Sequence, residues 1–496
     1  MKYLKVLLVF FIFFGCNREV AIRKPNVIII YADDLGYGDV SAYGLGKLQT
    51  PNIDLLANNG SRFTSGYSSS ATCSPSRYAL MTGTYPWRNK RAKILTGANL
   101  IIDSLEMTLP KMLKEEGYQT AIVGKWHLGL GNSKIDYNQR ISPGPNEVGF
   151  DYSYIMPDTQ DRVPTVYMEN GRVKNLDPND PIEVSFEENF EGQPTGRENP
   201  ELLSMKWHHG HDGTIVNGIS RIGFMKGGEK AKWRDVDMAD EFLNQAKNYI
   251  DQAKEKPFFL YYALQQPHVP RTPHPRFVGT STMGPRGDAI LEADWCIGQL
   301  YAHLKQNNLL ENTLIILSSD NGPVLNDGYY DEAVEKLGEH TPAGNFRGGK
   351  YSLYEAGTRV PLITYWKDQI KPSVSDQMVS QIDFLNSIAS LIGSEIRTKD
   401  GIDLADVLFQ NEGVGREEFI LEAQTKTAFR RKNWVLIPPY SGPQKNSFVN
   451  IELGNAPEYQ LFNLEEDSSQ QNNLAQSHPE QLKIMIDRYQ TILNSN

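Results

Sequence analysis

Four short apolar runs between residues 26 and 322 constrain the fold most, because each leads directly into polar residues that can carry chemistry. They are NVIIIYADD (26–34), YQTAIVGKWH (118–127), KPFFLYYALQQPH (256–268) and NTLIILSSDNG (312–322). Short runs rich in β-branched and aromatic residues are typical of buried strands in a mainly parallel sheet. In such sheets ligands bind beyond the carboxyl ends of the strands, which is where these polar residues fall.

Segments with helical periodicity separate the runs, at residues 50–60, 109–117, 237–256 and 287–304. Strands that alternate with helices predict an α/β fold, with a large, mainly parallel sheet between layers of helices. Residues 135–235 are rich in Pro, Gly, Asn and charge, and we expect loops and short elements there. The short runs after residue 410 end in a helical pattern at 479–493. We therefore predict a catalytic domain at 24–400 and a smaller α+β domain at 401–496.

The first sixteen residues, MKYLKVLLVFFIFFGC, have the character of an export signal. Lys2 and Lys5 precede an apolar run at 6–14, which is shorter than the roughly 20 residues that a membrane-spanning helix needs. The ending FFGC resembles a bacterial lipoprotein signal, in which Cys16 would be lipidated and become the mature N-terminus. We expect an exported protein, periplasmic or at the cell surface, with plain secretion and an uncleaved anchor as the alternatives.

The net charge of −10 argues against nucleic acid as a partner. No long run of Lys and Arg occurs anywhere in the sequence, so the basic patch that binds a phosphate backbone is missing. Any anion that the protein binds must be held by a local cluster of residues.

An all-oxygen set of metal ligands follows two of the predicted strands. Asp33 and Asp34 end the first run, and Asp320 and Asn321 end the last. Carboxylate and amide oxygens suit a hard cation such as Ca²⁺ or Mg²⁺ better than zinc. A lone Asp pair at a strand end is more often a turn or a helix cap, and the second pair is what favours a metal site.

Four residues that can carry positive charge fall beside this predicted metal site. Lys125 and His127 are two apart, so an extended backbone would point both side chains the same way. His268 lies in PHVP, which has a proline at each end, and Lys350 lies in the glycine-rich segment FRGGKYSLYEAG. Each alone is more often structural. Together they describe a pocket for a tetrahedral oxyanion.

Cysteine is rare in this chain, with three in 496 residues. Cys296 shares one helical face with apolar neighbours and is interpreted as an inert core thiol. Cys73 begins CSPSRYALMTG, a helix pattern that ends at a glycine. A helix N-terminus favours negative charge, so the setting of Cys73 suits a nucleophile that handles anions.

The segment Cys73-Ser74-Pro75-Ser76-Arg77 resembles the C-x-P-x-R signature of type I sulfatases, which have an alkaline-phosphatase-like fold. In this family a maturation enzyme oxidises the cysteine to formylglycine (3-oxoalanine). The resemblance extends from about residue 25 to the C-terminus through ADD, TPNIDLLANNG, LMTGTYP, GKWHLG, SDNG, GGK and EYQLFNLEED. It implies a mixed, mainly parallel sheet sandwiched by helices.

The resemblance also implies a role for each candidate residue. A hydrated aldehyde at residue 73 offers two hydroxyls on one carbon, one to attack sulfur and one to expel sulfate. One Ca²⁺ would be held by Asp33, Asp34, Asp320, Asn321 and the modified residue 73. Arg77 would stabilise the aldehyde hydrate, and Lys125, His268 and Lys350 would contact sulfate. His127 would be the base, with His268 or Lys350 the acid for the leaving alcohol.

We therefore expect a sulfuric ester hydrolase that acts from the end of a sulfated carbohydrate. The alternatives are a broad arylsulfatase, a phosphate or phosphonate ester hydrolase on the same scaffold, and a glycan-binding lipoprotein without activity. The loops DTQDR (158–162) and WHHGHDG (207–213) are expected to line the pocket mouth. For HHGH we favour substrate or loop contacts over a second metal site.

Overall fold

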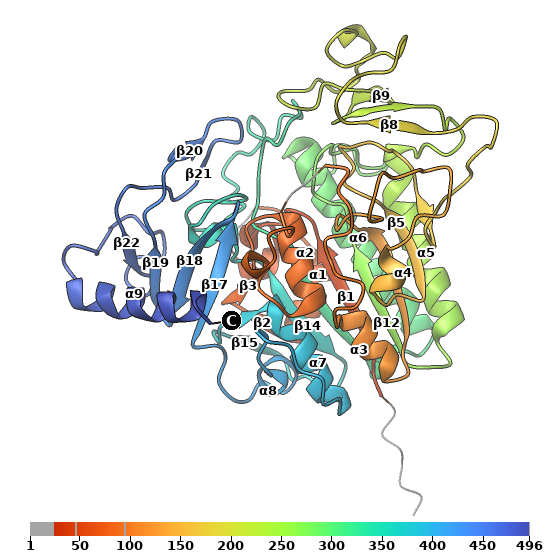
Figure 1. Ribbon diagram of the computed structural model, residues 1–496. Helices are drawn as coiled ribbons and strands as arrows, with labels where there is room; N and C mark the ends of the chain where they lie inside the picture. The colour runs from red at the N-terminus through yellow and green to blue at the C-terminus, as the bar shows by residue number, and fades with distance from the viewer. Residues whose placement is uncertain (1–23, 45–46, 94–95, 496) are drawn as a thin grey trace, which may run out of the picture.

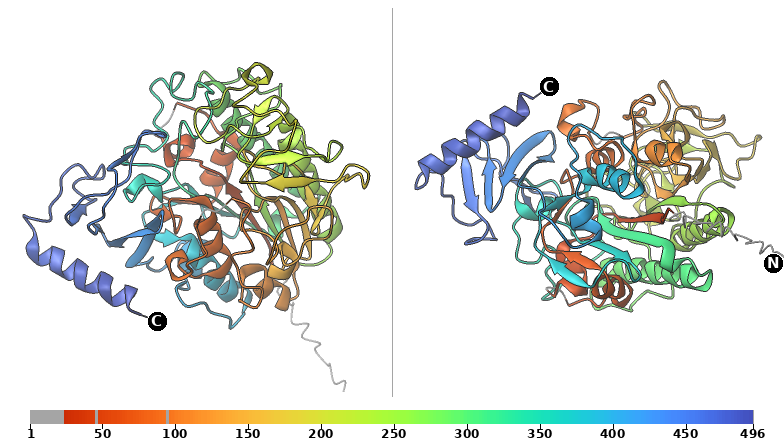
Figure 2. Two further views of the ribbon diagram at one scale, coloured as in Figure 1. Left: turned by 45° about the horizontal axis from the view of Figure 1, so that its top comes forward. Right: turned by 90° about the horizontal axis from the view of Figure 1, so that it is seen from below.

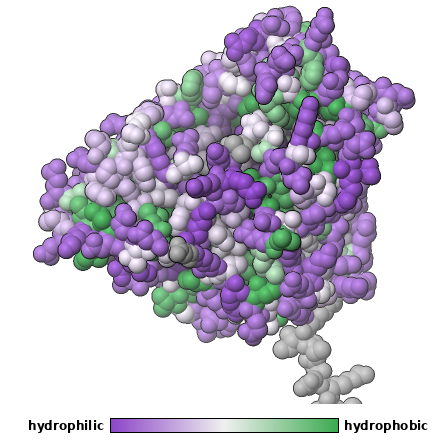
Figure 3. Space-filling model, in the orientation of Figure 1, coloured by the Kyte–Doolittle hydropathy of each residue, from purple (hydrophilic) through white to green (hydrophobic). Residues whose placement is uncertain are grey.

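The computed structural model describes residues 24–44, 47–93 and 96–495 (Figure 1). The predicted export signal and Cys16 lie outside these residues. Within the described part of the chain, every helix is too short or too polar to cross a membrane. The face in Figure 3 is mostly hydrophilic, and its apolar side chains form several separate groups.

A ten-stranded sheet forms the centre of the fold, in the order β15-β2-β14-β13-β1-β12-β4-β5-β6-β7. Its middle is parallel and contains all four predicted apolar runs. These middle strands are β13 (Thr313–Ser319), β1 (Asn26–Ala32), β12 (Phe258–Ala263), β4 (Gln119–Lys125) and β5 (Tyr152–Met156). The flanking strands are β15 (Ser373–Ser375), β2 (Ser61–Phe63), β14 (Leu362–Trp366), β6 (Met168–Glu169) and β7 (Arg172–Val173), with antiparallel pairings at both sides. The predicted mixed, mainly parallel sheet is confirmed.

Each face of the sheet is covered by helices, because the strands are apolar on both sides. Along β1, Val27 and Ile29 belong to one buried apolar cluster, and Ile28 and Ile30 belong to the other. One layer contains α1 (Pro51–Asn59), α5 (Met238–Ala253) and α6 (Gly284–Gln306). The other contains α2 (Cys73–Thr82), α3 (Leu109–Glu115), α7 (Phe384–Ile392) and α8 (Ala405–Phe409). Cys296 lies on the buried face of α6 and belongs to the core, as its helical face predicts.

A smaller antiparallel sheet and a helix lie to one side of the main sheet (Figure 2). The sheet contains β17 (Glu418–Ala423), β18 (Lys426–Arg431), β19 (Trp434–Ile437) and β22 (Gln460–Asn463), and α9 (Pro479–Leu493) packs on it. The sequence pattern missed β18, because KTAFRR has too few apolar residues to predict a strand. The helix α8 packs against α7 and β14, and the domain division at residue 400 stays a prediction.

Much of residues 135–235 forms loops and short elements over the sheet, as expected, but β5, β6 and β7 belong to the sheet itself, which the expectation missed. The short elements include α4 (Pro145–Val148), β8 (Glu183–Ser185), β9 (Ile215–Val216), β10 (Ile219–Ser220) and β11 (Phe224–Lys226). The remaining short strands are β3 (Gly66–Tyr67), β16 (Val379–Ser380), β20 (Lys445–Asn446) and β21 (Ile451–Glu452).

The smaller sheet is joined to the segment that leads into α2. The amide of Ala71 donates to the carbonyl of Glu422 at 2.7 Å, and the amide of Glu422 donates to Ser69 at 3.2 Å. The residues just before Cys73 are therefore held between the two sheets.

Candidate active site

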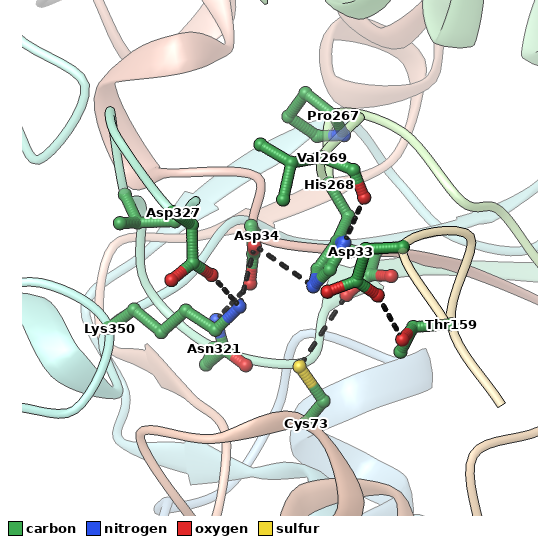
Figure 4. Close-up of polar contacts among 12 residues, drawn as sticks. Asp33, Asp34, Cys73, Thr159, Pro267, His268, Val269, Asn321, Asp327 and Lys350 are labelled. Atoms are coloured by element: carbon green, nitrogen blue, oxygen red, sulfur yellow. Dashed lines mark hydrogen bonds and ion pairs between the residues drawn. The ribbon is translucent and has the colours of Figure 1, made fainter. Parts of the chain in front are cut away.

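The carboxyl ends of the parallel strands bring the predicted site residues to one edge of the main sheet. Asp33 and Asp34 follow β1, which lies between β13 and β12. Asp320 follows β13, Lys125 ends β4, and His268 follows β12. Figure 4 shows Cys73, Asp33, Asp34, Asn321, His268 and Lys350 pointing toward one another from segments far apart in the chain.

The acidic residues form a compact buried group with Cys73. One ligand atom each from Asp33, Asp34, Cys73 and Asp320 lies within 4.8 Å of the others. Asp34 has a φ of 64°, and its amide donates to Oδ1 of Asp320 at 3.1 Å. Its carboxylate accepts a hydrogen bond from Nδ2 of Asn321 at 2.7 Å. The described residues supply no hydrogen-bond partner for the buried Oδ1 of Asn321.

The electrostatics of this group fit a bound cation. Burial, and then the charge of Asp320, raise the pKa of Asp33 well above its ordinary value. Burial also acts to raise the pKa of Asp320, but Arg77 and Lys125 hold it below its ordinary value. Crowded carboxylates that tend to retain a proton favour a positive ion among them. The orphaned amide oxygen of Asn321 adds a further hard ligand.

Cys73 is the first residue of α2 and is almost fully buried. Its Sγ lies 3.7 Å from Oδ1 of Asp33. Burial, and then the charge of Asp320, raise the pKa of the Cys73 thiol well above its ordinary value. The side chain is therefore a protonated thiol near neutral pH, which is a poor nucleophile.

Arg77 lies one turn further along α2 and is fully buried. Its Nε and one terminal nitrogen donate to Oδ2 of Asp320 at 3.1 and 2.8 Å. The other terminal nitrogen donates to the hydroxyl of Tyr261 at 3.2 Å. Arg77 therefore ties the start of α2 to the end of β13.

Lys125 and His127 reach the site by different backbone geometries. The ammonium of Lys125 pairs with Oδ2 of Asp33. The backbone leaves β4 at Lys125, and His127 has a φ of 52°, so the expected extended backbone between them is not observed. Nε2 of His127 lies 2.7 Å from Arg162 and 3.1 Å from Oδ1 of Asp158. Its Nδ1 is buried and has no hydrogen-bond partner among the described residues.

Burial, followed by the positive charges of Lys125 and Arg162, lowers the pKa of His127 well below its ordinary value. Burial and Lys350 do the same to the pKa of His268. Both rings are therefore neutral near pH 7. Nδ1 of His268 lies 2.7 Å from the carbonyl of Val269, and Nε2 lies 3.8 Å from Oδ2 of Asp34.

Lys350 is shared between two carboxylates, one of which the sequence did not reveal. Its ammonium donates to Oδ2 of Asp34 at 2.9 Å and to Oδ2 of Asp327 at 2.8 Å. The hydroxyl of Tyr351 donates to Oδ1 of Asp327 at 3.1 Å. Asp327 lies in the polar segment NDGYY, where nothing in the pattern ties it to a lysine 23 positions later.

The two loops expected at the pocket mouth lie beside these residues. Asp158 and Arg162 contact His127, as described above, and Asp161 accepts from Nε2 of His211 at 2.8 Å. The negative charge of Asp161 acts to raise the pKa of His268. The pair of Asp161 and His211 therefore lies next to the site. The interaction of Asp158 with His127 could not be found from sequence, because both residues lie in irregular backbone.

The comparison with known proteins agrees with this arrangement. The family model described as Sulfatase matches residues 25–394. An N-acetylgalactosamine-6-O-sulfatase of Bacteroides thetaiotaomicron is 46% identical over 490 residues, which cover 96% of this chain and 96% of that protein. Arylsulfatase A of Homo sapiens is 31% identical over 395 residues, covering 78% of this chain and 68% of that protein.

Solved structures show the same fold. A structure from work on glycosaminoglycan metabolism by Bacteroides thetaiotaomicron superposes with a TM-score of 0.93 at 46% identity, covering 95% of this chain and 99% of that one. A sulfatase of Pseudoalteromonas sp. superposes with a TM-score of 0.71 at 27% identity, covering 95% and 90%. The chain therefore belongs to the type I sulfatases of the alkaline-phosphatase-like superfamily and is a sulfuric ester hydrolase.

Proposed function

We propose that this sulfatase removes sulfate from the end of a sulfated carbohydrate, with the 6-sulfate of N-acetylgalactosamine as the first substrate to test. The site's geometry carries the hydrolytic part, because Cys73 lies 3.7 Å from Asp33 inside a buried acidic cluster surrounded by cationic groups. The sugar is suggested by the name of the relative that is 46% identical over 96% of both chains. A broad arylsulfatase is the second candidate, because a 31% identical relative is an arylsulfatase.

Residue 73 is proposed to act as formylglycine, made from Cys73 by a maturation enzyme. The raised pKa of the buried thiol supports a chemical change, because an unmodified thiol at this position is a weak nucleophile. The hydrated aldehyde supplies two hydroxyls, one to attack sulfur and one to release sulfate. In that form an oxygen replaces Sγ, which suits the hard ligands around it.

Calcium is the proposed metal, held by Asp33, Asp34, Asp320 and Asn321. The unpartnered Oδ1 of Asn321 and the raised pKa of Asp33 support this assignment. A divalent cation bound there polarises a sulfate oxygen and lowers the cost of ionising the hydroxyl on residue 73.

The surrounding residues are proposed to bind sulfate and move protons. Lys125 and Lys350 place two buried ammonium groups beside the acidic cluster. His268 donates its Nδ1 hydrogen to the carbonyl of Val269, so its neutral ring offers only a lone pair at Nε2. Lys350 then remains the donor for the leaving alcohol. Arg77, fixed on Asp320, orients the group at residue 73.

His127 is proposed to take the proton that is released when sulfate leaves. Its lowered pKa keeps the ring neutral near pH 7, as a base requires. Nε2 accepts a hydrogen bond from Arg162 at 2.7 Å, because a guanidinium can only donate, so Nε2 is the nitrogen with the lone pair. Nδ1 then carries the ring hydrogen, and the ring that has taken a proton at Nε2 can donate it to Asp158, 3.1 Å away.

The net charge of the pocket favours a sulfate ester over a phosphate ester. Four carboxylates, Asp33, Asp34, Asp320 and Asp327, face the three cations Arg77, Lys125 and Lys350. One negative charge remains, and a divalent cation converts it to one positive charge. A sulfate monoester carries one negative charge, whereas a phosphate monoester carries close to two near pH 7.

Export and a lipid anchor at Cys16 are part of the same proposal. They are supported by the basic start and apolar run of residues 1–16 and by the FFGC ending. Labelling with a fatty acid should mark the natural protein and should fail to mark Cys16→Ala. Equal labelling of both would contradict the anchor.

Sulfate release, followed by ion chromatography, tests the function. The matured protein is incubated with the 6-sulfates of N-acetylgalactosamine and N-acetylglucosamine, an aryl sulfate and an aryl phosphate. We expect the highest kcat/KM on the galactosamine sugar and none above background with Cys73→Ala. Higher kcat/KM on the aryl sulfate than on either sugar favours the broad arylsulfatase, and preference for the phosphate overturns both.

A further inference from the structure

The histidines of the HHGH motif are left without a role by the mechanism above. They do not form a second metal site, because the groups of described residues with metal-binding geometry include none of the three. His211 uses Nε2 for Asp161 at 2.8 Å and Nδ1 for the carbonyl of His209 at 2.6 Å. His208 and His209 instead present their rings to aromatic side chains.

The HHGH loop is locked to the loop that carries Asp327. The amide of His208 donates to Gly328 at 2.7 Å, and the amide of Tyr330 donates to Lys206 at 2.9 Å. Gly328 has a φ of 116°, and a Cβ there would lie 2.0 Å from the His211 ring. The two loops are therefore held together. His208 bonds to Gly328, which directly follows Asp327, the partner of Lys350.

A separate two-stranded hairpin, which lies between β19 and β22 in the chain, reaches the same place from the other side. The strands β20 and β21 flank Phe448, and Ile451 of β21 packs on the Lys350 loop. A Cβ at Gly349 would lie 3.1 Å from Ile451, so the glycine beside Lys350 permits this contact. The hydroxyl of Ser352 donates to the carbonyl of Glu452 at 2.6 Å.

The rings of these segments meet and remain partly open to solvent. His209 stacks on Phe448 with ring centroids 4.8 Å apart and an angle of 21° between the ring planes. His208 meets Tyr330 edge to face, also at 4.8 Å. Phe448 and Tyr330 are each 58% exposed, whereas Asp327 and His211 are buried. Exposure of the side chains therefore increases outward from the buried pair of Lys350 and Asp327.

A pyranose ring has an apolar C–H face and a rim of hydroxyls. Half-exposed aromatic rings provide a flat apolar surface for such a face, and imidazole nitrogens can bond the hydroxyls. Under the proposed function the sulfated sugar binds beside Lys350 and Asp327, and the exposed rings beyond these two residues suit the next sugar in the chain.

We propose that His208, His209, Tyr330 and Phe448 form a second sugar subsite, which binds the residue attached to the sulfated sugar. This subsite rests on the proposed action on a carbohydrate and extends it from one sugar to an oligosaccharide. The HHGH loop and the β20–β21 hairpin thus jointly set a preference for chain length.

Kinetics on substrates of two lengths test the subsite. KM and kcat are measured on a 6-sulfated N-acetylgalactosamine monosaccharide and on a disaccharide with the same sulfated sugar at its non-reducing end. Stacking of an aromatic ring contributes about 0.5–1.5 kcal/mol, so Phe448→Ala should raise KM for the disaccharide about twofold to tenfold. The monosaccharide KM and both kcat values should not change, and Phe448→Trp should retain the wild-type ratio.

Ile484→Ala is the matched control, because Ile484 is 50% exposed on α9, which lies at the other end of the smaller sheet (Figure 1). It should behave as wild type on both substrates. A Phe448→Ala enzyme with equal changes on both substrates, or with none, overturns the subsite. If wild type releases sulfate from neither sugar but cleaves an aryl sulfate, the proposed function fails instead, and the two failures are distinct.

Discussion

The ammonium of Lys350 lies 2.9 Å from a carboxylate oxygen of Asp34, although the two residues are 316 positions apart. A second carboxylate, that of Asp327, holds the same ammonium at 2.8 Å. Asp34, Asp327 and Lys350 are all buried, so water screens the two ion pairs only weakly. Asp327 therefore positions the lysine that we propose as the proton donor.

Replacing Asp327 should weaken catalysis without removing the nucleophile. A hydrogen bond to a charged group contributes about 1.5–3 kcal/mol, so Asp327→Asn should lower kcat/KM at least tenfold. Asp376→Asn, at an exposed carboxylate that accepts from Gln377, is the control and should match wild type. Unchanged kcat/KM in Asp327→Asn would show that Asp34 alone positions Lys350.

Arg77→Lys keeps the positive charge but loses the planar pair of contacts to Asp320 at 3.1 and 2.8 Å. An ammonium cannot make both contacts and still reach Tyr261. We expect kcat to fall at least tenfold, with KM changed less, because residue 73 is no longer oriented. Steady-state kinetics and a thermal melt check this, and a variant with wild-type kcat would remove Arg77 from the mechanism.

Metal removal should destabilise the fold as well as stop the reaction. A ligand present at 100 times its Kd stabilises the folded state by about 2.7 kcal/mol. Dialysis against a chelator should therefore lower Tm, and added Ca²⁺ should restore it. Asn321→Ala should lose most of this response, because Oδ1 of Asn321 is the ligand without another partner among the described residues. Identical melting curves with chelator and with Ca²⁺ speak against the metal site.

Asp39 is a buried carboxylate that should make the stability of the fold depend on pH. Its carboxylate accepts from Arg286 at 2.8 and 2.6 Å, from His340 at 2.8 Å and from the amide of Gly36 at 2.8 Å. Burial acts to raise the pKa of Asp39, but Arg286 and His340 lower it to about 2. As pH falls, the unfolded chain binds the proton first, so the stabilisation is present above about pH 4 and is lost towards pH 2.

Removing one partner of a buried ion pair costs about 3–5 kcal/mol, so Asp39→Asn should lower the free energy of unfolding by that amount at pH 7. Between pH 7 and pH 2 the difference from wild type should shrink by about 2 kcal/mol. Chemical denaturation at pH 7 and pH 2 measures both values. A difference that does not change with pH would mean that Asp39 is not ionised in the folded protein.

The pattern of apolar runs was sufficient to predict the centre of the fold, because parallel strands buried on both faces are apolar throughout. All four runs became neighbouring strands, and this adjacency places Asp33 beside Asp320. The strand β18 was not predicted, because KTAFRR has polar side chains at several positions, although Ala428 and Phe429 are buried. A strand in a small edge sheet can be polar along much of its length.

Two contacts of the site that the sequence pattern did not predict involve residues in irregular backbone. Asp327 reaches Lys350, and Asp158 reaches His127, from loops whose course no periodicity describes. Lys125 and His127 were expected to share a direction along a strand, but the positive φ of His127 turns the chain first. The motifs identified Lys125, His127 and Lys350, and the path of the loops decided which carboxylates these residues meet.

The mass of the peptide containing residue 73, taken from a preparation that releases sulfate, decides whether formylglycine carries the reaction. We predict an aldehyde in place of the Cys73 thiol, in a fraction of molecules that rises and falls with the rate of sulfate release. A preparation that cleaves the sulfated sugar at full rate while every peptide carries the unmodified thiol would contradict it.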